Sequence, residues 1–505
     1  MDITKTRGYD KEQAIPERNT DAEVSWPSTR TELEKQQIEI DKGIDILLNG
    51  TKQKKNSGLS TVNCLAYAVA HIYNDMCGTV WFMYLLYFIT YTADYGPKVA
   101  SAALLSGQIT DGIAANLIGF LIDKTKTRIG KTTPLFLFGT FLTMPMFFLT
   151  FGPCYACDII CSLTSQGSCS SNMYQTILYA NYIIVPALLN IGCAAIQVST
   201  MSIIVSITYD QAQRDSLISY RNACTFGSNL FTLSIALLLF EFAPDGIWQF
   251  RILVCSITLL GVLAAIFYLY GVPEVALSNK ALTQDIKFST WSIESAGNSV
   301  SHWWEWLLAQ QFYCYGLAYT LAKMTINVTM MLTPFYLVHV MMFEQSEETP
   351  TPLAIASVPL ASYFSSMAFT LIISKRLNKY FDQRNRLIGL LISSCLVAIS
   401  SLPFLWITVR LHWVIYVLVA IQGLGMALGL NITSSLISDM LGRNSKTNAF
   451  VYGTYGLFDR FASGAVLTIC STVIEEEKWL RILIGVIPIC TMLTACTLVS
   501  IANRK

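Results

Sequence analysis

Charge is the scarcest property of this sequence. Of its 505 residues, 13% are Asp, Glu, Lys or Arg, whereas a soluble globular protein averages roughly 25%. So few charges cannot cover the surface of a water-soluble fold of this size. The formal net charge of +1 gives no basic excess for a nucleic-acid partner. A mean hydropathy of +0.48 agrees with what remains, a polytopic membrane protein.

Histidine is nearly absent, and the motifs of soluble enzymes are missing. The chain has four histidines, and no two of them are spaced like a pair of metal ligands: His71, His302, His339 and His412. There is no Walker A sequence, no dinucleotide-binding glycine pattern and no nucleophile elbow. We therefore expect neither an enzyme nor a bound cofactor or metal. The missing P-loop also excludes a self-contained ATP-driven pump.

The first 58 residues differ from the rest, since they hold ten Lys or Arg and eleven Asp or Glu and no long apolar run. This composition predicts a disordered cytosolic tail over residues 1–58. From residue 59 onward, apolar runs are long enough to cross ~30 Å of hydrocarbon. The twelve predicted spans are 61–90, 98–122, 134–152, 176–206, 216–240, 250–271, 308–340, 352–374, 387–409, 413–438, 447–473 and 480–502.

The distribution of basic residues indicates that both termini are cytosolic. Seventeen Lys and Arg fall on the tail's side of the predicted spans, whereas the other side receives five: Lys98, Arg251, Arg410, Lys478 and Arg481. The longest connection, 272–307, lies on the cytosolic side and separates six spans over 59–271 from six over 308–505. Two six-helix bundles around a central cytosolic loop are typical of the major facilitator fold, so we predict an all-α protein of that class.

Four of the fourteen cysteines crowd the predicted loop between spans three and four, on the non-cytosolic side: Cys154, Cys157, Cys161 and Cys169. Disulfides persist in that compartment, so we expect one or two bridges of unspecified connectivity. A zinc site is the alternative, although no histidine lies near. The ten other cysteines are interpreted as small packing residues.

Span one contains His71, Asn74 and Asp75 at positions i, i+3 and i+4, which places them on one helical face. A carboxylate one turn from an imidazole forms a plausible proton-binding pair, because each group alters the proton affinity of the other. Asn74 is placed with the substrate-binding residues. The alternative is a structural hydrogen-bond cluster that joins span one to a neighbour.

Span two carries Gln108 and Asp111 one turn apart near its middle, and Asp111 joins Asp75 and His71 as a candidate for proton or cation coupling. The cytosolic end of this span has a different composition. There a glycine allows close helix approach, and an aspartate can pair across the two halves in one conformation. We interpret this segment as a gating element, with Gly119, Asp123, Lys124 and Arg128 as its residues.

Spans seven and eleven hold the remaining buried charges. A charge at membrane depth costs about 2.5–3.5 kcal/mol on insertion scales, so it is normally paired or faces a wet path. The candidate substrate-binding residues there are Lys323, Asn327, Tyr452, Tyr455, Asp459 and Arg460. Asp459 beside Arg460 could instead form a self-neutralising structural pair. The spans thus hold three deep carboxylates, Asp75, Asp111 and Asp459, and two deep cations, Lys323 and Arg460. One carboxylate has no cation to balance its charge, as expected of a site that binds a proton or cation.

These motifs resemble the domain-containing-protein-12 branch of the major facilitator superfamily. The resemblance rests on Leu65-Ala-Tyr-Ala-Val-Ala-His71-Ile-Tyr-Asn74-Asp75, Gly107-Gln-Ile-Thr-Asp111-Gly, Phe151-Gly-Pro153-Cys154-Tyr-Ala-Cys157 and Asn448-Ala-Phe-Val-Tyr-Gly453. The wider kin are the glycoside–pentoside–hexuronide cation symporters, whose span two reads D-A-x-x-D-P-x-x-G. Asp111 matches the first aspartate, but Ala115 and Asn116 replace the second aspartate and the proline, so sodium coupling of that kind is not expected. The cationic residue of their span eleven falls on Arg460.

The resemblance implies a twelve-helix facilitator that imports cysteine into melanosomes and lysosomes. A zwitterionic amino acid suits the mixed charges, because it offers a carboxylate to Arg460 or Lys323 and an ammonium to Asp75 or Asp111. Proton coupling is a further hypothesis. We expect a monomer in the lysosomal or melanosomal membrane, with the plasma membrane as the alternative location. The alternative functions are a cation-coupled sugar or lysolipid transporter of the same fold, and a non-transporting membrane sensor or scaffold.

Overall fold

Helices make up almost all regular structure in the part of the chain that the computed structural model describes. That part comprises residues 59–163, 171–208, 211–243, 245–289, 304–342, 352–372, 386–441, 448–471 and 476–503, all within one unit, Leu59–Lys505. The helices of its first half are α2 (Thr61–Val69), α3 (Ile72–Tyr87), η1 (Phe88–Thr92), α4 (Pro97–Lys124), α5 (Thr133–Thr150), α6 (Tyr155–Ser162), α7 (Ser171–Ile207), α8 (Gln211–Phe242) and α9 (Gly246–Gly271).

The second half follows α10 (Glu274–Ser289) and α11 (Trp304–Leu307). Its helices are α12 (Gln310–Phe335), η2 (Tyr336–Val340), α13 (Ala354–Ile372), α15 (Arg386–Ser401), η3 (Leu402–Leu405), η4 (Val409–Leu411), α16 (His412–Leu441), α17 (Asn448–Ser471) and α18 (Glu477–Ala502). Among the described residues, every predicted span is occupied by one helix or by consecutive helices. The all-α architecture predicted from the sequence is therefore confirmed.

Eight of the described helices are long and apolar enough to cross a membrane by length and composition. The predicted spans 216–240 and 352–374 are represented in this respect by the shorter apolar helices Gly227–Phe242 and Ala354–Phe369. The helices of spans one and eleven are not among these eight. Both carry candidate site residues with charged side chains, Asp75 on α3 and Asp459 with Arg460 on α17.

The predicted first span is not one continuous helix. It consists of α2, α3 and η1, and the break falls between Ala70, the C-cap of α2, and His71, the N-cap of α3. Ser60 and Asn63 cap the start of α2 reciprocally, and Pro97 occupies the first turn of α4, where its missing N–H leaves no unsatisfied donor. Spans one and seven both end in a π-helical turn, η1 and η2, a geometry that is often found at functional positions.

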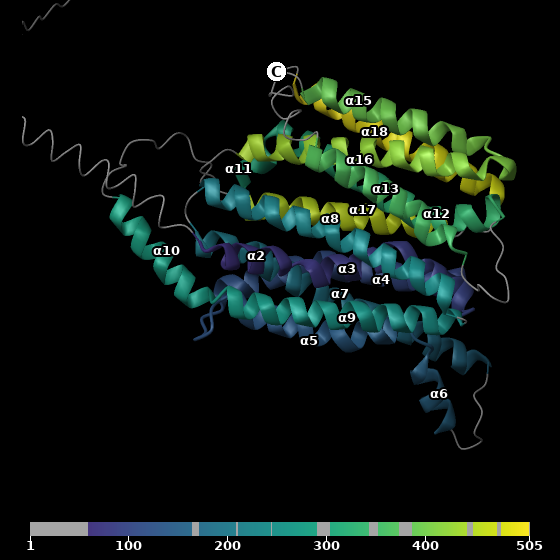
Figure 1. Cartoon of the computed structure of the whole chain (residues 1–505), viewed down its shortest axis with the longest axis horizontal. Coiled ribbons are helices and arrows are strands. Elements are labelled where there is room, and N and C mark those ends of the chain that lie inside the picture. The colour runs from purple at the N-terminus through teal and green to yellow at the C-terminus, as the bar shows by residue number, and fades with distance from the viewer. Residues whose placement is uncertain are drawn as a thin grey trace, which may run out of the picture. The chain divides into compact units, whose positions relative to one another are not determined.

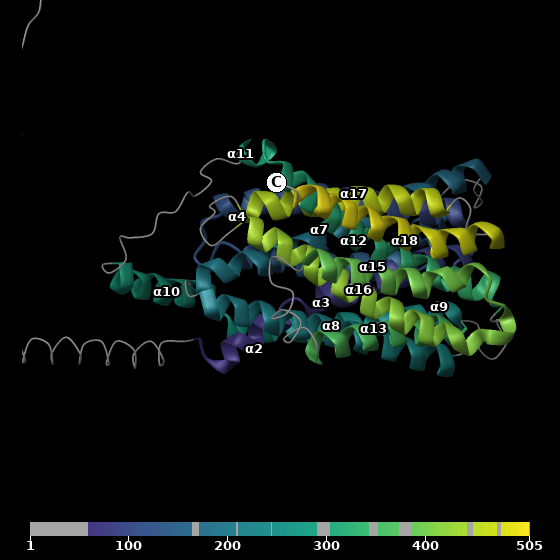
Figure 2. The same ribbon diagram turned by 90° about the horizontal axis from the view of Figure 1, so that it is seen from above.

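The most extensive contacts between the two halves, among the described residues, join α3 with α12, α4 with α17, and α8 with α13. In Figure 1 most helices of the first half, purple to teal, lie below those of the second half, green to yellow, and α8 lies at the level of α17. Figures 1 and 2 agree that the long helices run side by side in a common direction, with α10 at one end of this bundle. Candidate residues on α3, α4, α12 and α17 therefore lie at the boundary between the halves.

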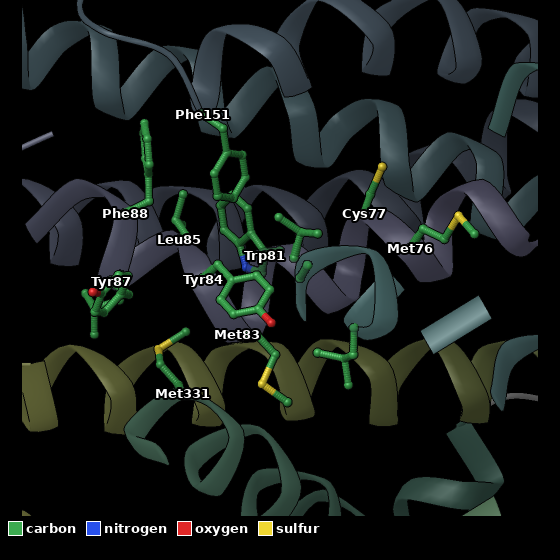
Figure 3. Close-up of a cluster of buried hydrophobic side chains, with 14 of the residues drawn as sticks. Met76, Cys77, Trp81, Met83, Tyr84, Leu85, Tyr87, Phe88, Phe151 and Met331 are labelled. Carbon is green, nitrogen blue, oxygen red and sulfur yellow. The ribbon is translucent and has the colours of Figure 1, made fainter. Parts of the chain in front are cut away.

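Aromatic side chains from α3 fill the core beneath this boundary. Tyr84 packs edge-on against Phe240 and Phe250, with ring centroids 5.5 and 5.9 Å away. Figure 3 shows Met83 of α3 and Met331 of α12 on one side of α3, with Phe151 on the other. Because these side chains are almost fully buried, α3 is held firmly by both halves.

Candidate functional site

A carboxylate and an imidazole lie together at the start of α3. Nε2 of His71 is 3.5 Å from Oδ1 of Asp75, and both side chains are almost fully buried. Thr225 of α8 donates a 2.5 Å hydrogen bond to Oδ2 of Asp75, while the hydroxyl of Thr200 on α7 lies 3.1 Å from Nδ1 of His71. An acid and a base held this close can share a single proton.

An ion pair joins the two halves near the middle of α4 and α17. Arg460 of α17 donates through Nε to Oδ2 of Asp111 on α4, and through Nη2 to Oε1 of Gln197 on α7 at 2.9 Å. The two charged side chains are 15% and 14% exposed. The second carboxylate oxygen of Asp111 is buried and has no hydrogen-bond partner among the described residues. The pair therefore leaves one acceptor oxygen for another donor.

A second ion pair lies within the second half. Nζ of Lys323 on α12 is 3.5 Å from Oδ2 of Asp459 on α17; the Asp459 side chain is 5% exposed and that of Lys323 is 36% exposed. Ser463 donates to Asp459 at 3.4 Å and accepts from Asn327 at 3.2 Å, and the ring of Tyr319 lies 5.8 Å from Nζ. Lys323 neutralises a buried carboxylate while part of its own surface stays accessible.

The neighbouring residues Asp459 and Arg460 do not pair with each other in these contacts. Consecutive helical residues point about 100° apart, so Asp459 faces α12 while Arg460 faces α4. Of the three deep carboxylates, Asp75 lies beside an imidazole, whereas Asp111 pairs with Arg460 and Asp459 pairs with Lys323. The charges of Arg221 and Lys323 also act on Asp75.

Close packing of α4 on α17 brings Arg460 within reach of Asp111. A Cβ atom added at Gly112 would lie 3.0 Å from the side chain of Leu457, and one at Gly464 would lie 3.0 Å from Cβ of Gln108. Side chains at these positions would hold the helices farther apart. The glycines of spans two and eleven therefore set the distance across which the ion pair forms.

Tyr455 is placed differently from the sequence prediction. Its hydroxyl donates to the carbonyl of Phe312 at 2.6 Å, its ring lies 5.1 Å from the Phe312 ring, and the residue is 1% exposed. Tyr455 lies on the face of α17 that packs on α12, but it belongs to the core of the second half rather than to the charged cluster. Asn74 is half-buried on α3, and the side chain of Tyr452 lies outside the described residues.

The predicted gating element is partly described. Gly119 lies where an added Cβ would be 4.0 Å from Val198 of α7. Lys124 and Arg128 are exposed, and Nζ of Lys124 lies 4.0 Å from the ring centroid of Phe120. The side chain of Asp123 falls outside the described residues, so its pairing across the halves stays a prediction.

Close to this segment lies a buried carboxylate, that of Glu274, which the sequence does not predict as a site residue. Glu274, at the start of α10, is 5% exposed and accepts hydrogen bonds from the N–H groups of Lys131, Thr132 and Thr133 and from both threonine hydroxyls, at 2.8 to 3.1 Å. Burial raises the pKa of Glu274, but hydrogen bonds from Thr133, Thr132 and Lys131 outweigh it, and the net pKa lies below its ordinary value. The ionised carboxylate thus anchors α10 to the N-terminus of α5.

Cys154 and Cys157 form a disulfide bond at the start of α6. Cys161 is also disulfide-bonded, and Cys169 lies outside the described residues. The backbone N–H of Cys154 donates to the hydroxyl of Tyr95 at 3.0 Å, which ties the loop to the connection between spans one and two. No group of three potential metal ligands occurs among the described residues, so the zinc alternative gains no support there.

The π-helical turns of spans one and seven touch each other. The hydroxyl of Tyr91 in η1 is hydrogen-bonded to Nε2 of His339 in η2, and the Tyr91 ring also packs on Phe335. This contact joins the two halves at the end of the spans that the charge distribution predicts to be non-cytosolic. The halves are therefore linked both here and at the Asp111–Arg460 pair.

Sequence reasoning underestimated the neutral polar residues of the site. Gln197, Thr200 and Thr225 are not among the residues that the sequence predicts for the site. Their partners lie on other helices, so spacing within one helix carries no sign of the contacts. The only available signal was a polar side chain within an apolar span.

Comparison with known proteins confirms the resemblance and the fold. A family model described as MFS/sugar transport protein matches residues 66–476. The horse major facilitator superfamily domain-containing protein 12 is 25% identical over 475 residues, 87% of this chain and 93% of the relative. The human protein of that name is 24% identical over 435 residues, 82% and 85% of the two chains. Among solved structures, a partially occluded inward open conformation of the E. coli xylose transporter XylE matches with a TM-score of 0.59 and 12% identity, covering 86% of this chain and 97% of its own.

Proposed function

The chain belongs to the MFS/sugar transport protein family, and on that premise we propose that it carries cysteine or a similar small zwitterionic amino acid by alternating access. The family and the fold make it a multi-pass secondary transporter rather than an enzyme. We further propose that it moves the amino acid from the cytosol into lysosomes or melanosome-like organelles. The organelle and the direction follow from the resemblance in spans one, two and eleven.

The alternation of opposite charges supports an amino-acid substrate. Arg460 can hold a carboxylate through two parallel hydrogen bonds, and the unoccupied oxygen of Asp111 can accept from an ammonium group. Lys323 and Asp459 repeat the same pair of charges one helix away. A neutral sugar offers hydroxyl groups only and would leave such charges without ionic partners.

The single observation that carries the proposal is the Arg460–Asp111 ion pair between the two halves. Alternating access needs contacts between the halves that form in one state and break in the other. A substrate carboxylate competes with Asp111 for the guanidinium, so binding weakens this link while the substrate ammonium compensates the released carboxylate. Substrate binding is then coupled to the rearrangement of the two halves.

Proton coupling is proposed for Asp75 and His71. The pair is buried, shares one site and has a hydroxyl partner on each side, as a group that binds and releases one proton requires. Asp111 is the alternative proton acceptor, through its unoccupied oxygen. Uptake that does not respond to collapse of an imposed pH gradient would remove this part of the proposal and leave the carrier itself intact.

The decisive experiment is uptake of labelled L-cysteine by purified protein in liposomes. We expect saturable uptake, and a loss of at least about tenfold for Arg460→Gln, because a charge-assisted hydrogen bond contributes about 1.5–3 kcal/mol. Arg481→Gln is the matched control, since Arg481 forms an ion pair with Glu477 at the end of α18. Equal uptake by wild type and Arg460→Gln would contradict the role of Arg460.

A competition series separates the substrate classes. Excess unlabelled alanine, xylose and a lysolipid are added to the same assay. Inhibition by the amino acid alone supports the proposal, whereas inhibition by the sugar or the lysolipid favours the alternative transporter of the same fold. No uptake of any of these solutes would favour a non-transporting sensor or scaffold. Co-fractionation of the tagged protein with lysosomal markers tests the location.

A further inference from the structure

Two sets of hydrogen bonds that meet at Gln197, one at its backbone carbonyl and one at its side chain, connect the His71–Asp75 pair to the ion pair between the halves. The first set runs from Nδ1 of His71 to Oγ1 of Thr200 at 3.1 Å, and from Oγ1 of Thr200 to the carbonyl oxygen of Gln197 at 3.0 Å. The side chain of Gln197 then accepts from Arg460 at 2.9 Å, and Arg460 holds Asp111. Together these contacts form a polar path from α3 through α7 to α17 and α4.

The hydroxyl of Thr200 has one proton to donate and three possible acceptors, two backbone carbonyls of α7 and Nδ1 of His71. It bonds the carbonyls of Ile196 and Gln197, at 2.9 and 3.0 Å, only if Nδ1 of His71 is the donor toward its oxygen. If Nδ1 carries no proton, the hydroxyl must turn and donate to the ring instead. The direction of this one hydroxyl therefore depends on the protonation of His71.

Asp75 fixes which nitrogen of the ring is protonated. When the His71–Asp75 pair holds no extra proton, the neutral ring places its hydrogen on Nε2, facing the carboxylate, and Nδ1 is an acceptor. When the pair binds one proton, either as an imidazolium or as a protonated carboxyl, Nδ1 becomes a donor. Proton binding at Asp75 and His71 therefore releases the Thr200 hydroxyl to the backbone of α7.

We propose that Thr200 is a positioning residue that couples the protonation of the His71–Asp75 pair to the Gln197–Arg460–Asp111 contact. In the protonated state its hydroxyl stabilises the turn of α7 from Ile196 to Thr200 and holds Gln197 against Arg460. In the deprotonated state this turn loses a hydrogen bond, and the hold on Arg460 weakens. The proposal rests on the proposed function and gives it a physical link between proton and substrate.

Other ionisable groups surround the pair and are kept unchanged in the test. They are Arg221 and Cys224 from α8, Lys323 from α12, Tyr363 from α13 and Cys77 from α3 itself. Lys323 and Arg221 act on Asp75 through charge. Thr200 differs from them because its hydroxyl does not ionise in the pH range of the test. It is 1% exposed and contacts both the ring of His71 and the backbone of α7.

The first test is the pH profile of labelled cysteine uptake between pH 5 and 8. Thr200→Val keeps the shape of the side chain and removes the hydroxyl. The protonated pair then loses the acceptor for Nδ1–H, so the midpoint of the profile moves to lower pH by about 0.5–1 unit, the equivalent of one hydrogen bond. Thr200→Ser retains the hydroxyl and restores the wild-type profile. An unchanged midpoint in Thr200→Val overturns the proposal.

Thr433 of α16 provides a matched control. Its hydroxyl bonds the carbonyls of Gly429 and Leu430 at 2.9 and 3.2 Å, as the Thr200 hydroxyl bonds two carbonyls of α7, and it is fully buried. Thr433→Val therefore removes a similar local hydrogen bond without touching the polar path. It should leave the pH midpoint in place. A shift as large as that of Thr200→Val would mean that any such helix bond matters, and would overturn the proposal.

A second measurement needs no transport and so separates the two proposals. The thermal midpoint Tm is measured in detergent for His71→Gln, Arg460→Gln and the double variant, each with threonine retained at 200 and with Thr200→Val. We expect the two changes to be non-additive by about 1–2 °C with threonine and additive with Thr200→Val. Additivity in both series overturns the coupling. Absence of cysteine uptake in wild type would defeat only the proposed function.

Discussion

Replacement of Glu274 by glutamine tests how the start of α10 is anchored. One carboxylate oxygen accepts from Lys131 and Thr132, and the other from Thr132 and Thr133. The glutamine oxygen can keep one set of bonds, but its NH₂ group faces donors, which leaves the N–H of either Lys131 or Thr133 without an acceptor. A buried N–H group left without an acceptor costs about 1–3 kcal/mol, and loss of the negative charge at the N-terminus of α5 costs about 0.3–1 kcal/mol more.

The expected total of about 1–4 kcal/mol corresponds to a Tm lower by about 1–4 °C for a unit of this length, measured by thermal unfolding in detergent. Glu477→Gln is the matched control, because Glu477 also begins a helix but its side chain is 51% exposed and pairs with Arg481. An exposed pair of this kind contributes about 0.2–1 kcal/mol. A Tm for Glu274→Gln no lower than that of the control would refute the reasoning.

The pH dependence of this effect has a definite sign. The pKa of Glu274 is lowered in the folded protein, so its contribution is fully present above the unfolded value of about 4.3 and is lost as the pH falls through the folded value. The Tm difference between wild type and Glu274→Gln should be constant from pH 6 to 8 and should shrink below about pH 4. A difference that grows on acidification would show that the carboxylate is not the stabilising species.

Three further predictions follow from single contacts. Lys323→Met leaves the carboxylate of Asp459 buried without its cation, which costs about 3–5 kcal/mol and lowers the Tm. The double variant with Asp459→Leu should regain much of the lost Tm. A double variant less stable than Lys323→Met would contradict the pairing. Gly139→Ala should lower the Tm because its Cβ would lie 2.7 Å from the carbonyl of Gly192. Gly227→Ala, where an added Cβ has no atom within 4 Å, should be neutral or stabilising. Similar Tm values for both variants would argue against close packing of α5 on α7. Alkylation of the denatured, unreduced protein followed by peptide mass mapping should leave Cys154 and Cys157 unmodified, and modification of either would disprove the bond.

The sequence by itself determined the class of protein and the positions of its long helices. Scarce charge, long apolar runs and basic residues on one side are local or summed properties, so they predict an all-α membrane protein without knowledge of any contact. The sequence also located Asp75, Asp111, Lys323 and Arg460, because a charge within an apolar run is visible without its partner. Their importance could be inferred from the desolvation that membrane burial imposes.

Only the tertiary structure decided which charge meets which. Asp459 and Arg460 are adjacent in sequence, yet the rotation between consecutive helical positions directs one to α12 and the other to α4. Gln197, Thr200 and Glu274 acquired their roles from partners on other helices, and no spacing within one helix encodes such contacts. Tyr455 shows the same dependence, since only packing places its hydroxyl against the carbonyl of Phe312. Pairing across helices depends on packing distances, which glycines such as Gly112 set only once the helices are together.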